Sequence, residues 1–193
     1  MDIYKPAEDS YLLEKQIKKY AVGRVLDVGT GSGIQALTAV TFPNIREVVA
    51  VDINQKAVEE LQKIVEFRKL RKLKVLHSDL FEKVEAKFNL ILFNPPYLPQ
   101  DRGIDDPALY GGKKGWEIIE RLISQASRYL MEDGKILLLF STLTNKKKVE
   151  EILEEHLFEW KQVASQKLSF EELFVYEIRK TELLRELERY HLE

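Results

Sequence analysis

The sequence predicts an α/β fold in which a mostly parallel β-sheet is covered by helices on both faces. Stretches rich in valine, isoleucine and leucine alternate with amphipathic helical stretches along most of the chain, as they do in proteins with parallel sheets. The strands are apolar almost throughout, which is typical of strands buried on both faces. Glycines, acids or prolines follow several strands, and ligands in such folds bind beyond the carboxyl ends of the strands. We therefore expect the functional site at that edge of the sheet.

The expected elements alternate regularly up to residue 156. Strands are expected at 24–29, 47–53, 74–79, 88–94 and 135–141, and helices at 32–42, 55–70, 116–130 and 147–156. The end of the chain differs, because the stretches 160–168 and 172–180 are separated only by a short turn. This spacing indicates an antiparallel hairpin added to the parallel sheet. Residues 181–193 are expected to form a charged terminal helix.

Composition excludes several classes of protein. With 193 residues, 45% of them hydrophobic and 32% charged, the chain is expected to form one globular domain over residues 1–193. Its net charge of -2 gives no general attraction to polyanions. The absence of cysteine excludes a disulfide scaffold, a cysteine nucleophile and cysteine-bound zinc, and three scattered histidines do not predict a metal site. The longest apolar run, 136–140, is too short to span a membrane, and no signal-peptide pattern is present, so we expect a cytoplasmic protein.

A glycine-rich turn follows the first expected strand. Gly29, Gly31 and Gly33 form a GxGxG pattern, and without Cβ atoms they let a ligand lie against the backbone. Ile34 stands where a dinucleotide fingerprint would have glycine or alanine, so a nicotinamide or flavin cofactor fits less well. Asp27 could accept hydrogen bonds from a cationic ligand amine or from N–H groups of the loop, and both interpretations stay open here.

Two further acids stand at the ends of the second and third expected strands. Asp52 follows Gly33 by 19 residues, the position at which a carboxylate binds both hydroxyls of a ribose. The alternative is that Asp52 caps the helix that begins near Gln55. Asp79 could accept a hydrogen bond from the exocyclic amine of adenine, or it could be an exposed turn residue.

The most specific signal in the chain is Asn94-Pro95-Pro96-Tyr97, which follows the apolar run LILF. Prolines fix φ and have no N–H, so the backbone here can present carbonyl oxygens without competing donors. The side-chain carbonyl of Asn94 and the backbone carbonyl of Pro95 could accept both hydrogens of a planar NH2 group, while Tyr97 stacks on that plane. The pattern predicts a clamp for an amide or amine; the alternative is a rigid turn with a packed tyrosine.

Taken together, these motifs resemble the class I S-adenosylmethionine-dependent methyltransferases, in particular the HemK-like family that methylates a glutamine side chain in the GGQ loop of class-1 translation release factors. Segment 4–10 (YKPAEDS) matches the YxPxEDS pattern of that family, and the motifs above match its later ones. The resemblance implies a Rossmann-like, seven-stranded sheet. Bacterial members carry an extra helical domain before the first motif, so the chain resembles the short archaeal and eukaryotic branch.

The resemblance implies S-adenosylmethionine as the cofactor, covered by residues 1–20, with direct transfer of its methyl group to the substrate nitrogen. Cofactor binding is implied for Ser10, Asp27, Gly29, Gly31, Gly33, Asp52, Asp79 and Asn94. Substrate binding and catalysis are implied for Asn94, Pro95, Pro96 and Tyr97. Segment 111–115 (GGKKG) matches a Gly-Gly-x-x-Gly segment of family members and is expected to border the substrate.

The resemblance also implies two partners: a class-1 release factor as the substrate and a small zinc-binding activator subunit. In the methyltransferase strand order, strand 74–79 would be an edge of the sheet, with backbone groups free to pair with another chain. Val75 and Leu76 would place apolar side chains on its opposite faces. Lys72 and Lys74 would limit indiscriminate pairing, and the alternative is that they protect a monomer.

A nucleic acid amino-methyltransferase is the main alternative, because the same clamp could bind a flipped base. The basic runs 68–74 and 146–148 are the local features that would support it. Both also have simpler interpretations, the first as a helix C-terminus where cations favour the dipole and the second as a solvated helix start. The chain also lacks an added target-recognition domain, which favours a protein substrate. A non-enzymatic scaffold is less expected, since the glycine turn, Asp52 and Asn94 are all present.

Overall fold

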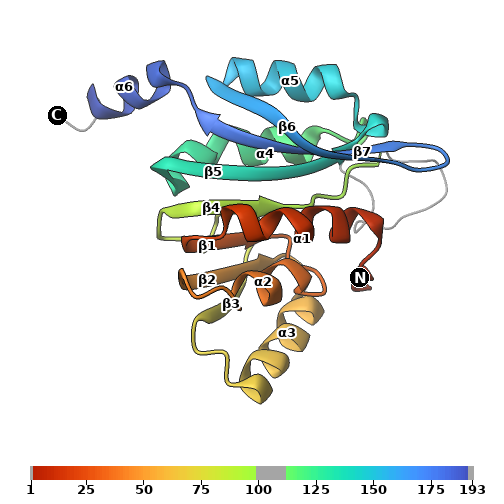
Figure 1. Ribbon diagram of the computed structural model, residues 1–193, viewed down its shortest axis with the longest axis vertical. Helices are drawn as coiled ribbons and strands as arrows, with labels where there is room; N and C mark the ends of the chain where they lie inside the picture. The colour runs from red at the N-terminus through yellow and green to blue at the C-terminus, as the bar shows by residue number, and fades with distance from the viewer. Residues whose placement is uncertain (1, 99–111, 191–193) are drawn as a thin grey trace.

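The computed structural model describes residues 2–98 and 112–190, which form a sheet with helices on both faces (Figure 1). Its strands are β1 (Gly23–Val28), β2 (Ile45–Asp52), β3 (Leu73–His77), β4 (Phe88–Phe93), β5 (Leu130–Ser141), β6 (Phe158–Lys167) and β7 (Glu172–Lys180). Its helices are α1 (Glu8–Tyr20), α2 (Ile34–Ala39), α3 (Gln55–Arg68), α4 (Glu117–Ala126), α5 (Lys146–Glu155) and α6 (Glu182–Tyr190), with 3₁₀ turns η1 (Ser127–Tyr129) and η2 (Thr142–Thr144).

The sheet has the order β3-β2-β1-β4-β5-β7-β6. Strands β1 to β5 pair in parallel, whereas β7 runs antiparallel to both β5 and β6. The predicted α/β fold is confirmed, including the seven strands, the antiparallel C-terminal hairpin and the place of β3 at an edge. No helix in the described part of the chain is both long and apolar enough to cross a lipid bilayer.

Alternate residues of each central strand supply two separate cores, one on each face of the sheet. On one face, β1, β4 and β5 pack against α1, α2 and α3 through side chains such as Leu13, Ile17 and Leu61. On the other face, the intervening strand residues pack against α4 and α5 through Leu122 and Ile152. This double burial is why the strands read as continuous apolar runs.

The register of the parallel strands brings their carboxyl ends to one level. Val28, the last residue of β1, pairs with Val51 on one side and with Phe93 on the other. Asp52 pairs in turn with His77, the last residue of β3. The segments that follow β1, β2, β3 and β4 therefore leave the sheet together, as the location of the expected site requires.

Most element bounds differ from expectation by a few residues, and three of these differences affect the site or the packing. Helix α2 begins only at Ile34, because the three glycines before it adopt positive φ angles of 64°, 52° and 81°. Strand β3 ends at His77, so Asp79 lies in the turn beyond it. The expected helix 116–130 ends at Ala126, and Leu130 already belongs to β5, where it pairs with Phe88.

Candidate active site

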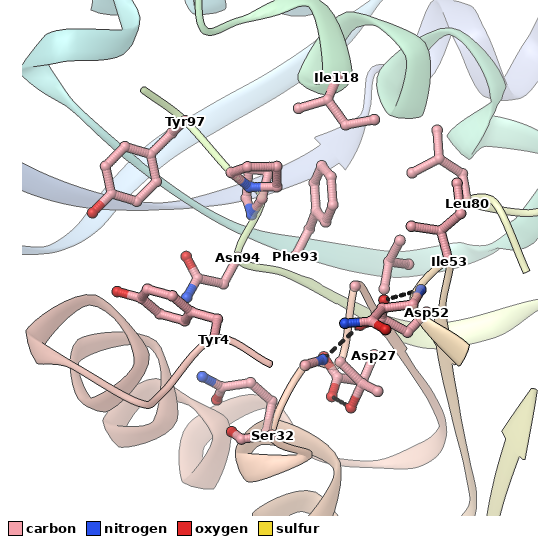
Figure 2. Close-up of a pocket in the computed structure, with 18 of the residues that line it drawn as sticks. Tyr4, Asp27, Ser32, Asp52, Ile53, Leu80, Phe93, Asn94, Tyr97 and Ile118 are labelled. Carbon is pink, nitrogen blue, oxygen red and sulfur yellow. Dashed lines mark hydrogen bonds between the residues drawn. The ribbon is translucent and has the colours of Figure 1, made fainter. Parts of the chain in front are cut away.

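A pocket of about 460 Å³ opens at the carboxyl ends of β1 to β4. It is lined by the leading segment, the glycine turn, the turns after β2 and β3, residues 93–98 and the first turns of α4. All the candidate residues named from the sequence border it except Gly33. Figure 2 shows Asp27 and Asp52 at one end of the pocket, and Asn94 at the other end with Tyr4 and Tyr97 on either side.

The three glycines of the turn serve two different purposes. A Cβ atom added at Gly29 would meet no other atom within 4 Å, and at Gly31 it would meet only a backbone oxygen at 4.0 Å. Both positions therefore leave open space that a ligand can use. At Gly33 an added Cβ would lie 2.5 Å from a methyl group of Leu61, so this glycine is required for close packing of the turn against α3.

Asp27 lies fully buried beneath the turn. Its Oδ2 accepts hydrogen bonds from the hydroxyl of Thr30 at 2.6 Å and from the backbone N–H of Ala36 at 3.1 Å. Asp27 thus accepts hydrogen bonds from the glycine turn and the start of α2, which is the interpretation in which it stabilises the loop. It also borders the pocket. Burial raises its pKa to about 7, and the charge of Asp52 acts in the same direction, against the hydrogen bonds from Thr30 and Ala36.

Asp52 connects the glycine turn to the turn after β2. Its Oδ2 accepts from the N–H of Gly31 at 2.7 Å, and its Oδ1 accepts from the N–H of Asn54 at 2.8 Å. The interpretation of Asp52 as the cap of α3 is wrong, because the capping side chain is that of Asn54, which accepts from the N–H of Lys56. Each Asp52 oxygen keeps a lone pair for a further donor.

Asp79 forms an ion pair that the sequence did not suggest. Its Oδ2 lies 2.8 Å from Nη2 of Arg121 on α4, and both residues border the pocket. Asp79 is therefore more than an exposed turn residue. The pair joins the turn after β3 to α4, and both border the pocket.

Asn94 is held by the leading segment. Its Nδ2 donates to Oδ2 of Asp9 at 3.0 Å, and the hydroxyl of Tyr4 donates to the other Asp9 oxygen at 3.2 Å. Among the described residues, the buried Oδ1 of Asn94 has no hydrogen-bond partner. A buried acceptor without a partner is costly, and this one belongs to a residue that lines the pocket. The site is thus one hydrogen-bond donor short.

The segment after Asn94 is fixed by the neighbouring strand end. The backbone carbonyl of Tyr97 accepts from the hydroxyl of Thr144, which follows β5, at 3.1 Å. Burial raises the pKa of the Tyr97 phenol, and the carboxylates of Asp9 and Glu171 reinforce that shift. Pro95 and Pro96 border the pocket with Tyr97, so the structure brings all four motif residues to one wall.

The leading segment only partly covers the pocket. Asp2, Ile3, Tyr4, Asp9 and Ser10 border it, whereas the later apolar residues of α1, Leu12, Leu13 and Ile17, pack into the core of the sheet. The backbone carbonyl of Ser10 accepts from the side chain of Gln35 at 2.9 Å, which ties this segment to α2. In segment 111–115, Gly111 lies outside the described residues and Gly112 borders the pocket.

Sequence reasoning missed the apolar wall of the pocket and the contact made by Arg121. The wall includes Ile53, Leu80, Phe93 and Ile118. Ile53 carries a signal that could have been used, because it is an apolar residue directly after the strand-end acid. The structure leaves its side chain 56% exposed. Arg121 lies in an ordinary amphipathic helix, and no local pattern distinguishes it.

The strand order, the glycine turn after β1 and the Asn-Pro-Pro-Tyr wall after β4 together define a class I methyltransferase fold. The family model of the methyltransferase small domain matches residues 7–171. The chain therefore belongs to this methyltransferase family. A ribosomal protein L11 methylase from Lactobacillus delbrueckii subsp. bulgaricus shares the fold, with a TM-score of 0.70 at 23% identity over 93% of this chain and 82% of that one.

Relatives with higher identity have names that refer to glutamine methylation. A protein of Methanocaldococcus jannaschii, provisionally named a protein N5-glutamine methyltransferase, is 38% identical over 90% of both chains. The release factor glutamine methyltransferase of Deinococcus radiodurans is 33% identical over 66% of this chain, which spans only 49% of that protein. Among solved structures, the Mtq2–Trm112 complex of E. cuniculi, responsible for methylation of the eRF1 translation termination factor, gives a TM-score of 0.72 at 26% identity over 94% of this chain and 100% of that one.

Proposed function

We propose that this chain is an S-adenosylmethionine-dependent methyltransferase that methylates the side-chain amide of the glutamine in the GGQ loop of a class-1 release factor. The observation that carries the proposal is the buried Oδ1 of Asn94, an acceptor without a partner among residues 2–98 and 112–190. An NH2 group entering the pocket would supply the missing donor. The proline that follows would add a second acceptor through its backbone carbonyl.

The pocket suits S-adenosylmethionine in shape and in chemistry. The open space at Gly29 and Gly31 would admit the cofactor against the backbone. Asp52 would accept from the ribose hydroxyls, and Asp79, beside the apolar side chain of Leu80, would bind the adenine. The bound cofactor would supply an electrophilic methyl group.

The residues of the chain would act on the glutamine by orientation. An amide nitrogen is a poor nucleophile because its lone pair is delocalised, so much of the rate must come from holding it in line with the methyl group. Asn94 and Pro95 would hold the two hydrogens of the NH2 group, and Tyr97 would pack on its plane. Their hydrogen bonds strengthen as these hydrogens become more acidic in the transition state.

The release factor is favoured as the substrate by the relatives rather than by the pocket alone. Two of them, from Deinococcus radiodurans and Lactococcus lactis, are named release factor glutamine methyltransferases, and the E. cuniculi complex methylates eRF1. Ribosomal protein uL3 glutamine methyltransferases also match, at 36% identity for the Bordetella pertussis protein, and they share the chemistry of the substrate group. Such substrates would place the enzyme in the cytoplasm, where translation takes place.

The test is to incubate the protein with isotope-labelled S-adenosylmethionine and a release factor and to locate the label by mass spectrometry. We expect one methyl group on the GGQ glutamine. The variant Asn94→Ala should bind the cofactor within about tenfold of wild type yet lose methyl transfer, because the missing acceptor acts on the amide in the transition state. Label in an added RNA or DNA, and none in the release factor, would instead support the nucleic acid alternative.

We further propose that the chain works with a small zinc-binding activator that pairs with β3. This strand is one of the two edges of the sheet, and beside it Ile53 is 56% exposed and Leu76 only half-buried. Part of the edge is covered, since the carbonyl of Val75 accepts from the side chain of Gln62 at 3.3 Å. A strand docked here would lie next to the turn that carries Asp79.

A further inference from the structure

A buried carboxylate stands behind the amide that is proposed to bind the substrate. Asp9, in the first turn of α1, is 4% exposed. Its Oδ2 faces Nδ2 of Asn94 at 3.0 Å. Its Oδ1 accepts from the backbone N–H of Ser10 at 2.6 Å, and the hydroxyls of Ser10 and Tyr4 donate to the same oxygen, each at 3.2 Å. Every partner of Asp9 is thus a donor.

The contact decides which end of the Asn94 amide faces the pocket. A side-chain amide has an acceptor end and a donor end of almost equal size, and rotation by 180° exchanges them. An ionised carboxylate can only accept, so it holds the NH2 end, and the oxygen must point the other way. The rotated amide would place its oxygen against the Asp9 carboxylate and its NH2 toward the substrate, where donor would meet donor.

We propose that Asp9 is a positioning residue for methyl transfer, which fixes the amide of Asn94 with its oxygen toward the substrate nitrogen. The inference rests on the proposed function and adds a residue to it. Hydrogen bonding to an anion also polarises the amide, which strengthens the acceptor at its other end. Asp9 would thus act on the reaction through Asn94 without touching the substrate.

Other charged and titratable groups lie near this contact and must be kept constant in any test. They are Glu8 in the same helical turn, Tyr4 in the leading segment, Tyr97 on the pocket wall and Glu171 in the turn between β6 and β7. Burial, the charge of Asp9 and its hydrogen bond raise the pKa of Tyr4, so this phenol stays a donor at neutral pH. All assays are therefore made at one neutral pH.

The informative variant is Asp9→Asn, which keeps the shape of the side chain and introduces a donor. The Asn94 amide could then bond in either orientation, so kcat for methyl transfer should fall by about tenfold or more. Affinity for S-adenosylmethionine, measured by calorimetry, should stay within about threefold. Glu8→Gln is the matched control, because Glu8 is exposed in the same turn and its loss should leave kcat unchanged. Unchanged kcat in Asp9→Asn, or an equal loss of cofactor affinity, would overturn the proposal.

The exchanged pair Asp9→Asn with Asn94→Asp separates orientation from general packing. In it the NH2 of residue 9 would donate to the carboxylate at 94, whose second oxygen would again face the substrate. We expect kcat of the double variant to be about tenfold higher than that of Asp9→Asn alone. If the double variant folds and binds the cofactor but kcat does not recover, the role of Asp9 is structural only. The proposed function is judged separately by wild-type activity. If wild type is inactive, NMR still tests the orientation of the Asn94 amide. The side-chain NH2 of Asn94 should exchange its hydrogens with solvent slowly in wild type, and this protection should be lost in Asp9→Asn.

Discussion

At the scale of single residues, two carboxylates at the ends of adjacent strands differ in their environment. Asp52 accepts from two backbone N–H groups at the edge of the pocket, whereas Asp27 is buried below the turn. Desolvation disfavours the charged form of a buried acid, and it raises the pKa of Asp27 from 3.8 to about 7. The protonation of Asp27 therefore changes near neutral pH, where the enzyme would work.

The raised pKa predicts the pH dependence of stability. Between about pH 4 and 7 the folded protein retains a proton on Asp27 that the unfolded chain has released, so this stabilising contribution is complete below pH 4 and is lost as the pH rises through 7. Asp27→Asn removes the buried charge and keeps an acceptor for Thr30 and Ala36. It should raise the free energy of unfolding by about 4 kcal/mol at pH 8 and change it little at pH 4.

Urea unfolding of wild type and Asp27→Asn at the two pH values measures this difference. Calorimetric titration with S-adenosylmethionine at pH 8 adds a second readout. If the ionised Asp27 also attracts the cationic amine of the cofactor's methionine part, Asp27→Asn should bind the cofactor about tenfold less tightly. A variant that is less stable than wild type at pH 8 would show that the carboxylate is needed to brace the turn.

At the scale of elements, the turn between β1 and α2 combines a ligand surface with a packing contact. Gly29 faces open space, whereas Gly33 faces Leu61 of α3, which is 1% exposed. The alternating glycines thus have two roles, leaving space for a ligand and allowing close packing against α3, and the sequence alone does not show which glycine has which role. The structure separates them by what an added methyl group would touch.

Alanine at the two positions should therefore have its main effect on different properties, stability at Gly33 and cofactor affinity at Gly29. Gly33→Ala combines a positive φ of 81° with a contact at 2.5 Å, and we expect it to lower the free energy of unfolding by about 2–3 kcal/mol. Gly29→Ala meets only backbone strain, about 1 kcal/mol, but its methyl group should reduce cofactor affinity at least tenfold. Urea unfolding and calorimetry of both variants decide the matter, and equal effects on stability would contradict the assignment.

The sequence predicted the fold and the position of the site because both depend on local patterns. Apolar period and turn residues locate the strands, and the motifs follow directly from the strand ends. What it did not predict are contacts between distant residues. Asp9 meets Asn94 across 85 positions, and Arg121 meets Asp79 across 42. The end of α4 was misplaced for the same reason, since Leu130 is held in β5 by Phe88 and by Nζ of Lys180.

At the scale of the whole molecule, the sheet presents two edges with different properties. β6 is ten residues long and forms the outer strand of the hairpin, and β3 is five residues long and lies beside the pocket. An edge strand offers backbone groups to a partner. Within residues 2–98 and 112–190, β3 is the only edge at which a docked strand would lie next to a turn that borders the pocket. Pairing there can therefore couple partner binding to the cofactor site.

The partner proposal predicts that Leu76→Lys weakens association with the activator. Leu76 is half-buried on one face of β3 and Val75 is 9% exposed on the other, so the expectation of apolar side chains on opposite faces is confirmed. A substitution at Val75 would also disturb the core, which makes Leu76 the better probe. Val163→Lys is the matched control, because Val163 is half-buried on the opposite edge strand, β6.

After co-expression with the activator, size-exclusion chromatography should show the complex for wild type and for Val163→Lys. For Leu76→Lys most of the complex should be lost, at an unchanged melting temperature. Cofactor affinity should fall with the complex, because the turn after β3 would lose its support. If both variants form the complex equally well, the activator does not bind at β3; and if the purified chain alone methylates the release factor at the rate of the complex, no activator is needed.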